Sequence, residues 1–274
     1  MNNMVSHPLA DSRLLDAVQA KMQLRQYSTE TIKAYMGQLR LFLRHIQPRE
    51  LHEIQMEEMR GYLQRLMKMD ASRSTIDQAI NAMKFLCREV FDLPFSLEDF
   101  SRPKKNKALP VLLTLEEVKR IAVAAENPKH RLMIELAYSA GLRVSELVEV
   151  RVKQVNLNRL MLFVPGIGKG KKGRITIFSE SLKDAIARQM GNKKPDDFLF
   201  PSERGGKLTT RSISKFFKAA LSASGVEKTA TLYSLRHSFA AYLLQNGTDL
   251  VTLQDLLGHN RPESTGLYAK VVNG

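Results

Sequence analysis

The sequence has little of the chemistry that marks secreted or membrane-spanning proteins. Cys87 is the only cysteine among 274 residues, so an internal disulfide cannot form. The apolar helical stretch around Cys87 predicts a buried thiol in a reducing compartment. Apolar runs such as residues 109–115 are far too short to span a bilayer, and residues 1–15 lack the apolar core of a signal peptide. We therefore expect a cytoplasmic, nucleoid-associated protein with no membrane contact.

Acidic residues are scarce relative to basic ones, with 28 Asp and Glu against 42 Lys and Arg and a net charge of +14. Such an excess favours a polyanionic partner, with nucleic acid ahead of an anionic membrane surface. Charge alone also leaves open a basic protein with no particular partner. Residues 112–274 hold 25 basic and 15 acidic side chains, whereas residues 1–97 hold 13 and 11. The second part of the chain therefore carries most of the positive charge.

The first 97 residues have the pattern of a helical domain. Hydrophobic residues make up 43% of the chain, and its length corresponds to about two domains of ~150 residues each. Apolar residues at helical spacing predict four helices, around residues 14–24, 32–46, 56–67 and 76–90. Ser28 is the expected N-cap of the second helix, and Ser72 or Ser74 that of the fourth.

Residues 98–111 break the helical pattern with two prolines and four basic side chains, which predicts an extended basic linker. The second domain, residues 112–274, opens with a capping box over residues 114–117 and a helix that Gly141 ends. Two short strands at 159–165 and 174–178, joined by a turn rich in glycine and lysine, predict a hairpin. Further helices are expected over residues 179–190, 209–222, 231–245 and 248–257.

Four segments of the second domain place cationic or nucleophilic groups at helix ends or turns. They are residues 141–147 with Arg143 and Glu146, the hairpin tip with Lys169, Lys171, Lys172 and Arg174, residues 233–239 with Arg236, and residues 256–259 with His259, followed by Tyr268. Each alone has an ordinary explanation as a surface ion pair, a solvated turn or a packed tyrosine. The hairpin tip lacks the spacing of a nucleotide-binding loop, and a flexible basic loop that reaches a phosphodiester is the better functional interpretation.

Together, and in this order, the four segments resemble the tyrosine recombinase (phage integrase) family, most closely its Xer-like members. Residues 141–147 match the first arginine box, Lys169 the β-hairpin lysine, and residues 235–240 the second arginine box. His259 and Tyr268 match the final histidine and the nucleophile at the family's spacing. The resemblance implies a mainly α protein, with a helical, SAM-like core-binding domain over 1–97 and a mixed α+β catalytic domain over 112–274 of the DNA breaking–rejoining type.

The implied activity is site-specific recombination of DNA through a 3′-phosphotyrosyl intermediate at Tyr268. Arg143 and Arg236 are expected to clamp the scissile phosphate, which replaces the work of a metal ion. Lys169 is expected to protonate the leaving 5′ oxygen, with Lys171 and Lys172 in the same turn as alternatives for this role, and His259 to hydrogen-bond the phosphate. No cluster with metal-ligand spacing is present in the sequence, so we expect no metal, cofactor or ATP. Glu146 is expected to orient Arg143 or the loop, and His237 to pack or to form a structural hydrogen bond without touching the phosphate. Tyr242 is the next candidate nucleophile.

The expected partners are duplex DNA with inverted-repeat recombination sites and further recombinase subunits that form a tetramer on that DNA. DNA contacts are assigned to a basic set of side chains: Lys104, Lys105, Lys107, Lys171, Lys172 and Arg174. A second recombinase or an accessory protein stays possible. So do two other functions, a type IB topoisomerase-like enzyme and a non-catalytic DNA-binding regulator on the same fold.

Two departures from the family pattern affect these expectations. Tyr233 stands where the family usually has histidine, three residues before Arg236. A phenol with an ordinary pKa near ~10 is a poor base at neutral pH, so we expect Tyr233 to donate a hydrogen bond or orient a neighbour, with packing as the alternative. Only six residues follow Tyr268, which leaves the mode of subunit assembly open.

Overall fold

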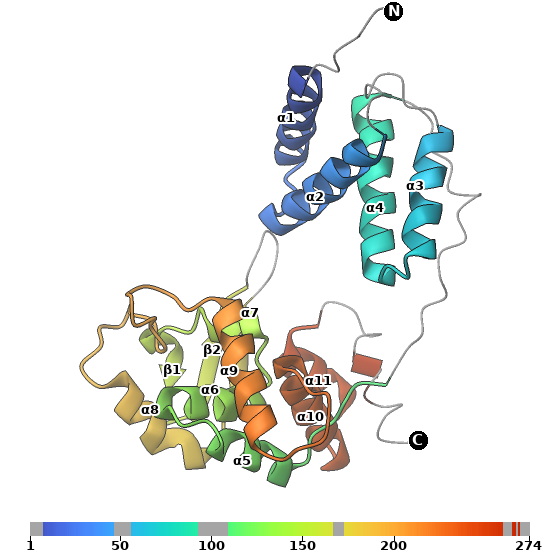
Figure 1. Ribbon diagram of the computed structural model, residues 1–274. Helices are drawn as coiled ribbons and strands as arrows, with labels where there is room; N and C mark the ends of the chain where they lie inside the picture. The colour runs from blue at the N-terminus through green and yellow to red at the C-terminus, as the bar shows by residue number, and fades with distance from the viewer. Residues whose placement is uncertain are drawn as a thin grey trace, which may run out of the picture. The chain divides into compact units, whose positions relative to one another are not determined.

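The computed structural model describes residues 8–46, 56–92, 109–166, 173–259, 265–266 and 268 (Figure 1). The chain divides into two compact units, Met1–Lys107 and Ala108–Gly274. Both are mostly helical. The lysines predicted to contact DNA, Lys104, Lys105, Lys107, Lys171 and Lys172, lie outside the described residues, as does the predicted general acid Lys169.

The first unit is a helical bundle. Its elements are α1 (Pro8–Leu24), α2 (Thr29–Ile46), α3 (Met56–Lys68), α4 (Arg73–Phe85) and a π-helical turn η2 (Leu86–Val90). Ser28 and Ser72 each accept a backbone N–H three residues on, at 3.2 Å, so the fourth helix is capped by Ser72 and not by Ser74. Cys87 is buried and its Sγ donates to Sδ of Met59 at 3.6 Å; burial raises the thiol pKa to about 11. The predicted buried thiol is confirmed.

The second unit packs helices around a small sheet. Its elements are α5 (Leu115–Val123), α6 (Pro128–Ser139), α7 (Val144–Leu147), η3 (Val152–Gln154), β1 (Val155–Asn156), β2 (Met161–Val164), β3 (Arg174–Ile177), η4 (Glu180–Leu182), α8 (Lys183–Met190), α9 (Thr210–Ala223), α10 (Leu232–Gln245) and α11 (Leu250–Leu257). The sheet is antiparallel in the order β1-β2-β3, with Val164 paired to Arg174 at the base of the hairpin. The predicted hairpin is therefore confirmed.

Helix α6 runs through the middle of the second unit and ends where the sequence predicts, at a glycine (Figure 1). Gly141 has a left-handed φ of +58°, and a Cβ there would lie 2.5 Å from Cδ1 of Phe239 on α10. A side chain at this position would meet both backbone strain and a steric clash. The glycine therefore sets how closely the end of α6 approaches α10.

Several elements differ from the expectations. The short helix α7 and the two-residue strand β1 were not predicted, because neither is long enough for a periodic pattern. The helix expected from residue 179 is a 3₁₀ turn followed by α8. Helix α11 starts after Asp249, later than the expected residue 248, because the Asp249 carboxylate caps it by accepting the N–H groups of Val251 and Thr252 at 2.9 Å.

In the described part of the chain, no helix is both long and apolar enough to cross a membrane. The same residues contain no group of three or more His, Cys, Asp or Glu side chains placed to hold a metal ion.

Candidate functional site

Glu146 lies at the centre of a cluster of arginines. Arg143 is the N-cap of α7, and Glu146 is the third residue of that helix. The backbone N–H of Arg143 donates to Oε2 of Glu146 at 2.7 Å, and Nη1 of Arg143 donates to Oε1 at 2.7 Å. A carboxylate three residues after the cap can reach back in this way, which explains the spacing of the first motif. Glu146 is 6% exposed, whereas the Arg143 side chain is 35% exposed.

Arg174, the first residue of β3, binds the same carboxylate from the other side. Its Nη1 and Nη2 donate to the two carboxylate oxygens of Glu146 at 2.6 and 2.8 Å, a bidentate pair. Its Nε donates to the carbonyl oxygen of Leu256 at 2.7 Å. The sequence analysis placed Arg174 among the expected DNA contacts, together with lysines. In the structure its side chain is only 10% exposed, and all three guanidinium nitrogens donate hydrogen bonds to oxygens of the protein.

Arg236 on α10 completes the cluster and is fully buried. Its Nη1 donates to the carbonyl oxygen of Gly141 at 2.8 Å, and its Nη2 to that of Leu257 at 2.5 Å. Nη1 also lies 3.6 Å from Oε2 of Glu146, within ion-pair range. Its Nε has no hydrogen-bond partner among the described residues. Burial and the positive charge of Arg143 lower the pKa of Arg236 to about 10, so it keeps its charge at neutral pH.

The arginines keep Glu146 ionised. Burial alone would raise the pKa of its carboxyl group, but the hydrogen bonds and charge of Arg174, together with the hydrogen bonds of Arg143, lower it to about 2. The carboxylate therefore holds its negative charge throughout the neutral range.

Tyr268 is 1% exposed, and its hydroxyl lies 2.9 Å from Nδ1 of His237. Burial, with the nearby Tyr233 phenol, raises the pKa of Tyr268 to about 12, while Arg236 and Arg143 act in the opposite direction. The rings of His259 and Tyr268 stack with centroids 6.3 Å apart and planes 12° apart. Nδ1 of His259 lies 2.9 Å from the Thr265 hydroxyl, which orients the imidazole.

Burial and the charge of Arg236 lower the pKa of both His237 and His259 to about 4, so each imidazole is neutral at pH 7. Tyr233 lies one turn before His237 on α10, and its ring meets the imidazole edge-on at 4.3 Å between centroids. The Tyr233 side chain is half exposed. A phenol thus faces solvent beside the histidine that contacts Tyr268.

Comparison with known proteins gives the family. The phage integrase family matches residues 112–273, and the phage integrase N-terminal SAM-like domain matches residues 14–96. The chain belongs to the phage integrase family. It is 31% identical over 267 residues to the tyrosine recombinase XerD of Oceanobacillus iheyensis, covering 90% of this chain and 89% of that protein. It is 32% identical over 268 residues to the tyrosine recombinase XerA of Pyrococcus horikoshii, covering 96% and 90%.

Among solved structures, a lambda integrase tetramer bound to a Holliday junction matches with a TM-score of 0.75 at 21% identity, covering 94% of this chain and 76% of that one. This likeness supports the fold. The predicted family and fold class are confirmed, and the protein is an Xer-like tyrosine recombinase, an enzyme of site-specific DNA recombination.

In this recombinase, four of the residues singled out from sequence come together: Arg143, Arg236, His259 and Tyr268. Tyr233 joins them through His237. His237 follows Arg236 directly and was expected to pack or to form a structural hydrogen bond, and its Nδ1 lies 2.9 Å from the Tyr268 hydroxyl. One contribution was missed. Arg174 was grouped with the DNA contacts, and no local pattern could show that Glu146, 28 residues away, takes its guanidinium.

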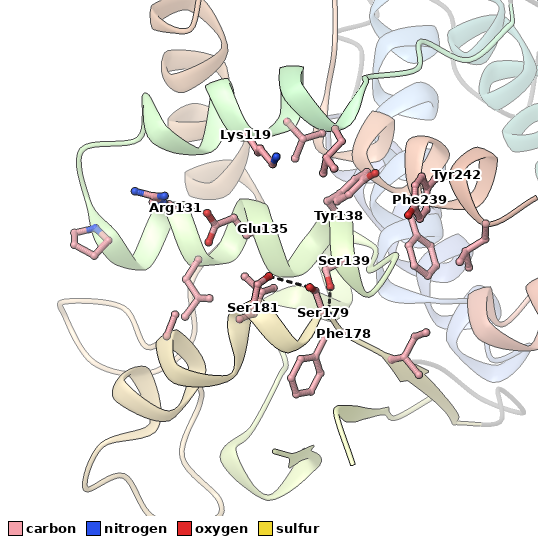
Figure 2. A pocket seen from close by; sticks show the side chains of 18 of the residues that line it. Lys119, Arg131, Glu135, Tyr138, Ser139, Phe178, Ser179, Ser181, Phe239 and Tyr242 are labelled. Atoms are coloured by element: carbon pink, nitrogen blue, oxygen red, sulfur yellow. Dashed lines mark hydrogen bonds and ion pairs between the residues drawn. The ribbon is translucent and has the colours of Figure 1, made fainter. Parts of the chain in front are cut away.

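The recombinase has a separate cavity of about 880 Å³ between α5, α6, α8 and α10. Figure 2 shows Tyr242 and Tyr138 near Phe239 along its wall. None of the three clustered arginines lines this cavity. Tyr242, the alternative nucleophile from sequence, therefore points to a different part of the unit.

Proposed function

We propose that this recombinase cleaves and rejoins DNA strands at specific duplex sites through a covalent bond between Tyr268 and a 3′-phosphate, without a metal ion or ATP. The observation that carries the proposal is the buried hydroxyl of Tyr268, which lies 2.9 Å from Nδ1 of His237 and near enough to Arg236 and Arg143 for their charges to act on its pKa. A nucleophile next to two guanidinium groups suits attack on a phosphodiester.

In the proposed reaction the Tyr268 oxygen attacks phosphorus and the bond from phosphorus to the 5′ oxygen breaks. Arg143 and Arg236 bind the non-bridging oxygens, and Lys169 protonates the departing 5′ oxygen. The reverse attack by a 5′-hydroxyl restores the phosphodiester and releases Tyr268. The energy of the broken bond stays in the phosphotyrosyl link, so rejoining needs no nucleotide.

The two histidines are assigned different tasks. With Nδ1 of His259 next to the Thr265 hydroxyl, its Nε2–H is the group that donates to a phosphate oxygen. Nδ1 of His237 accepts the Tyr268 hydrogen bond and so orients the nucleophile. Since the pKa of His237 is lowered to about 4, this imidazole is too weak a base to keep the tyrosine proton at neutral pH. Water or the phosphate itself takes that proton.

We expect Tyr233→Phe to slow single-turnover cleavage about tenfold, because the phenol donates a hydrogen bond to a phosphate oxygen. Tyr233→His should be tolerated, since imidazole can also donate. Tyr242→Phe is the matched control, because it removes a hydroxyl of similar exposure from the same helix, in the separate cavity. If Tyr233→Phe cleaves at the parental rate, Tyr233 serves only to pack against His237.

The proposed DNA contacts come from several basic segments. The linker lysines Lys104, Lys105 and Lys107 and the hairpin lysines Lys171 and Lys172 are assigned to phosphates. Helix α9 adds a basic face, because its exposed side chains include Arg211, Lys215 and Lys218 and its sequence contains no acidic residue. In this proposal the domains at 1–97 and 112–274, joined by residues 98–111, clamp the duplex between them.

We propose that the active assembly is a tetramer on two duplexes with inverted-repeat sites. Support comes from the structural neighbour, a lambda integrase tetramer bound to a Holliday junction. Two-fold symmetric subunit pairs suit inverted repeats, because each half-site then presents the same contacts.

Strand exchange between defined sites tests the function. A duplex is selected from a random-sequence library with the Tyr268→Phe variant, and two copies are placed on one plasmid. We expect wild type to form covalent adducts on this duplex and to recombine the two copies, in EDTA as well as without it. Equal relaxation of plasmids with and without the site would favour a topoisomerase-like enzyme. Tight binding with no adduct would favour a non-catalytic regulator, and loss of cleavage in EDTA would contradict the metal-free mechanism.

A further inference from the structure

We propose that Arg174 is a positioning residue for DNA cleavage, which holds the Glu146 carboxylate so that Arg143 and Arg236 stay aimed at the phosphate. This inference rests on the proposed function of the site. The structure ties Arg174 to two separate parts of that site, Glu146 on α7 and Leu256 on α11.

Arg174 does not contact DNA itself in this proposal. Its side chain is 10% exposed, and each of its three guanidinium nitrogens donates to an oxygen of the protein. Arg143 differs in both respects. Its side chain is 35% exposed, and its Nη2 makes only a long contact of 3.5 Å with the Gly258 carbonyl oxygen. Arg143 therefore has the more accessible donors for a ligand, whereas every guanidinium nitrogen of Arg174 already donates to an oxygen of the protein.

The ion pair between Arg174 and Glu146 keeps the side chains of Arg143 and Arg236 in position. The fork of Arg174 occupies both carboxylate oxygens of Glu146, while Nη1 of Arg236 stays 3.6 Å away and is held by the carbonyl of Gly141. Without Arg174, the carboxylate would be left with unmet acceptor sites in a buried place. Arg143 and Arg236 are the nearest donors, and their movement toward Glu146 would take them from the phosphate.

Arg174 also fixes the segment that leads to His259. The Leu256 carbonyl belongs to the last turn of α11, where carbonyl oxygens lack helical partners and a positive charge is favourable. The side chain packs closely on the turn that follows, because a Cβ at Gly258 would lie 2.8 Å from Cδ of Arg174. Gly258 has a left-handed φ of +61°, so glycine fits this turn for both reasons.

Finally, Arg174 lies at the base of the hairpin, paired with Val164. The Arg174 side chain thus joins β3 to two helix ends. One is that of α7, which carries Glu146, and the other is that of α11, which precedes His259. A single positively charged fork is suited to this task, because lysine offers one nitrogen and cannot bind both oxygens and the carbonyl in the same plane.

The test measures binding and cleavage separately on the selected duplex. We expect Arg174→Gln to slow single-turnover cleavage about 100-fold, comparable to the loss of one donor to a reacting oxyanion. Affinity, measured in the Tyr268→Phe background, should change less than about threefold. The cleavage rate of Arg174→Lys should lie between that of wild type and that of Arg174→Gln. Arg159→Gln is the matched control, because it removes the same charge from an exposed turn before β2.

A second substrate separates positioning from a general structural defect. A methylphosphonate at the scissile position lacks the negative charge that the arginines neutralise. The cleavage defects of Arg174→Gln and Arg143→Ala should both shrink to less than about tenfold on this substrate, if both act on the same charge. A defect of Arg174→Gln that is equally large on both substrates would overturn the proposal, as would cleavage at the parental rate. If Arg174→Gln does not fold, the same comparison is made with Arg174→Lys. A wild-type protein that forms no adduct would instead refute the proposed function.

Discussion

Tyr268→Phe is expected to bind the selected duplex with wild-type affinity and to form no covalent protein–DNA adduct. The change removes the attacking oxygen and keeps the aromatic ring, which packs in a buried cluster with Phe239, Leu253 and Leu257. Denaturing gel electrophoresis after incubation with a nicked duplex gives the readout, since only a covalent complex survives.

The stability of Tyr268→Phe should fall by only about 1 kcal/mol, because one hydrogen bond to Nδ1 of His237 is lost. Thermal unfolding checks that the variant is folded. Tyr242→Phe serves as the control and should form adducts as wild type does. Adducts formed by Tyr268→Phe would place the nucleophile elsewhere and remove the basis of the mechanism.

Glu146→Ala is expected to have the largest effect on stability. Removal of its carboxylate leaves the guanidinium groups of Arg143, Arg174 and Arg236 close together without their shared counter-charge. Breaking a buried ion pair by deleting one partner costs about 3–5 kcal/mol. Glu149→Ala is the matched control, because the Glu149–Lys207 pair is partly solvent-exposed, at 32% and 48% of the two side chains, and should contribute about 0–1 kcal/mol. Equal unfolding midpoints in urea for the two variants would contradict the central role of Glu146.

The same carboxylate gives the stability a defined pH dependence. The pKa of Glu146 is about 2 in the folded protein, below the ordinary glutamate value of about 4.3. The contribution of Glu146 is therefore fully present above about pH 4.3 and is lost as the pH falls toward 2. In Glu146→Gln this part of the acid loss should be absent, so its stability should fall less than that of wild type between pH 5 and pH 3. Urea unfolding at the two pH values measures the difference.

The sequence predicts the long elements of this protein well, for a physical reason. Helices such as α2 and α9 bury one face over several turns, and the two strands of the hairpin are short β-branched or apolar runs on either side of a glycine-rich turn. Helix α7 spans only four residues, so no period can develop. Its signal lies in the spacing of Arg143 and Glu146, which the sequence does show as a motif.

The arrangement of the site goes beyond local pattern. The pairs Arg174–Glu146 and His237–Tyr268 join residues 28 and 31 positions apart, and they form only once α10, α11 and β3 have packed. Motif spacing could therefore name Arg143, Arg236, His259 and Tyr268 as candidates. It could not distinguish an arginine that faces the substrate from one that faces a carboxylate, because the two look alike in sequence.

The net charge of the arginine cluster affects whether the site stabilises the intact phosphodiester or the transition state of its cleavage. Among the described residues, three guanidinium groups meet one carboxylate, so the cluster keeps two uncompensated positive charges. An intact phosphodiester carries a single negative charge, whereas the five-coordinate transition state carries about two when water takes the tyrosine proton. The two positive charges of the proposed site therefore balance the charge of the transition state and exceed that of the intact phosphodiester. This difference favours strand cleavage over simple binding of the duplex.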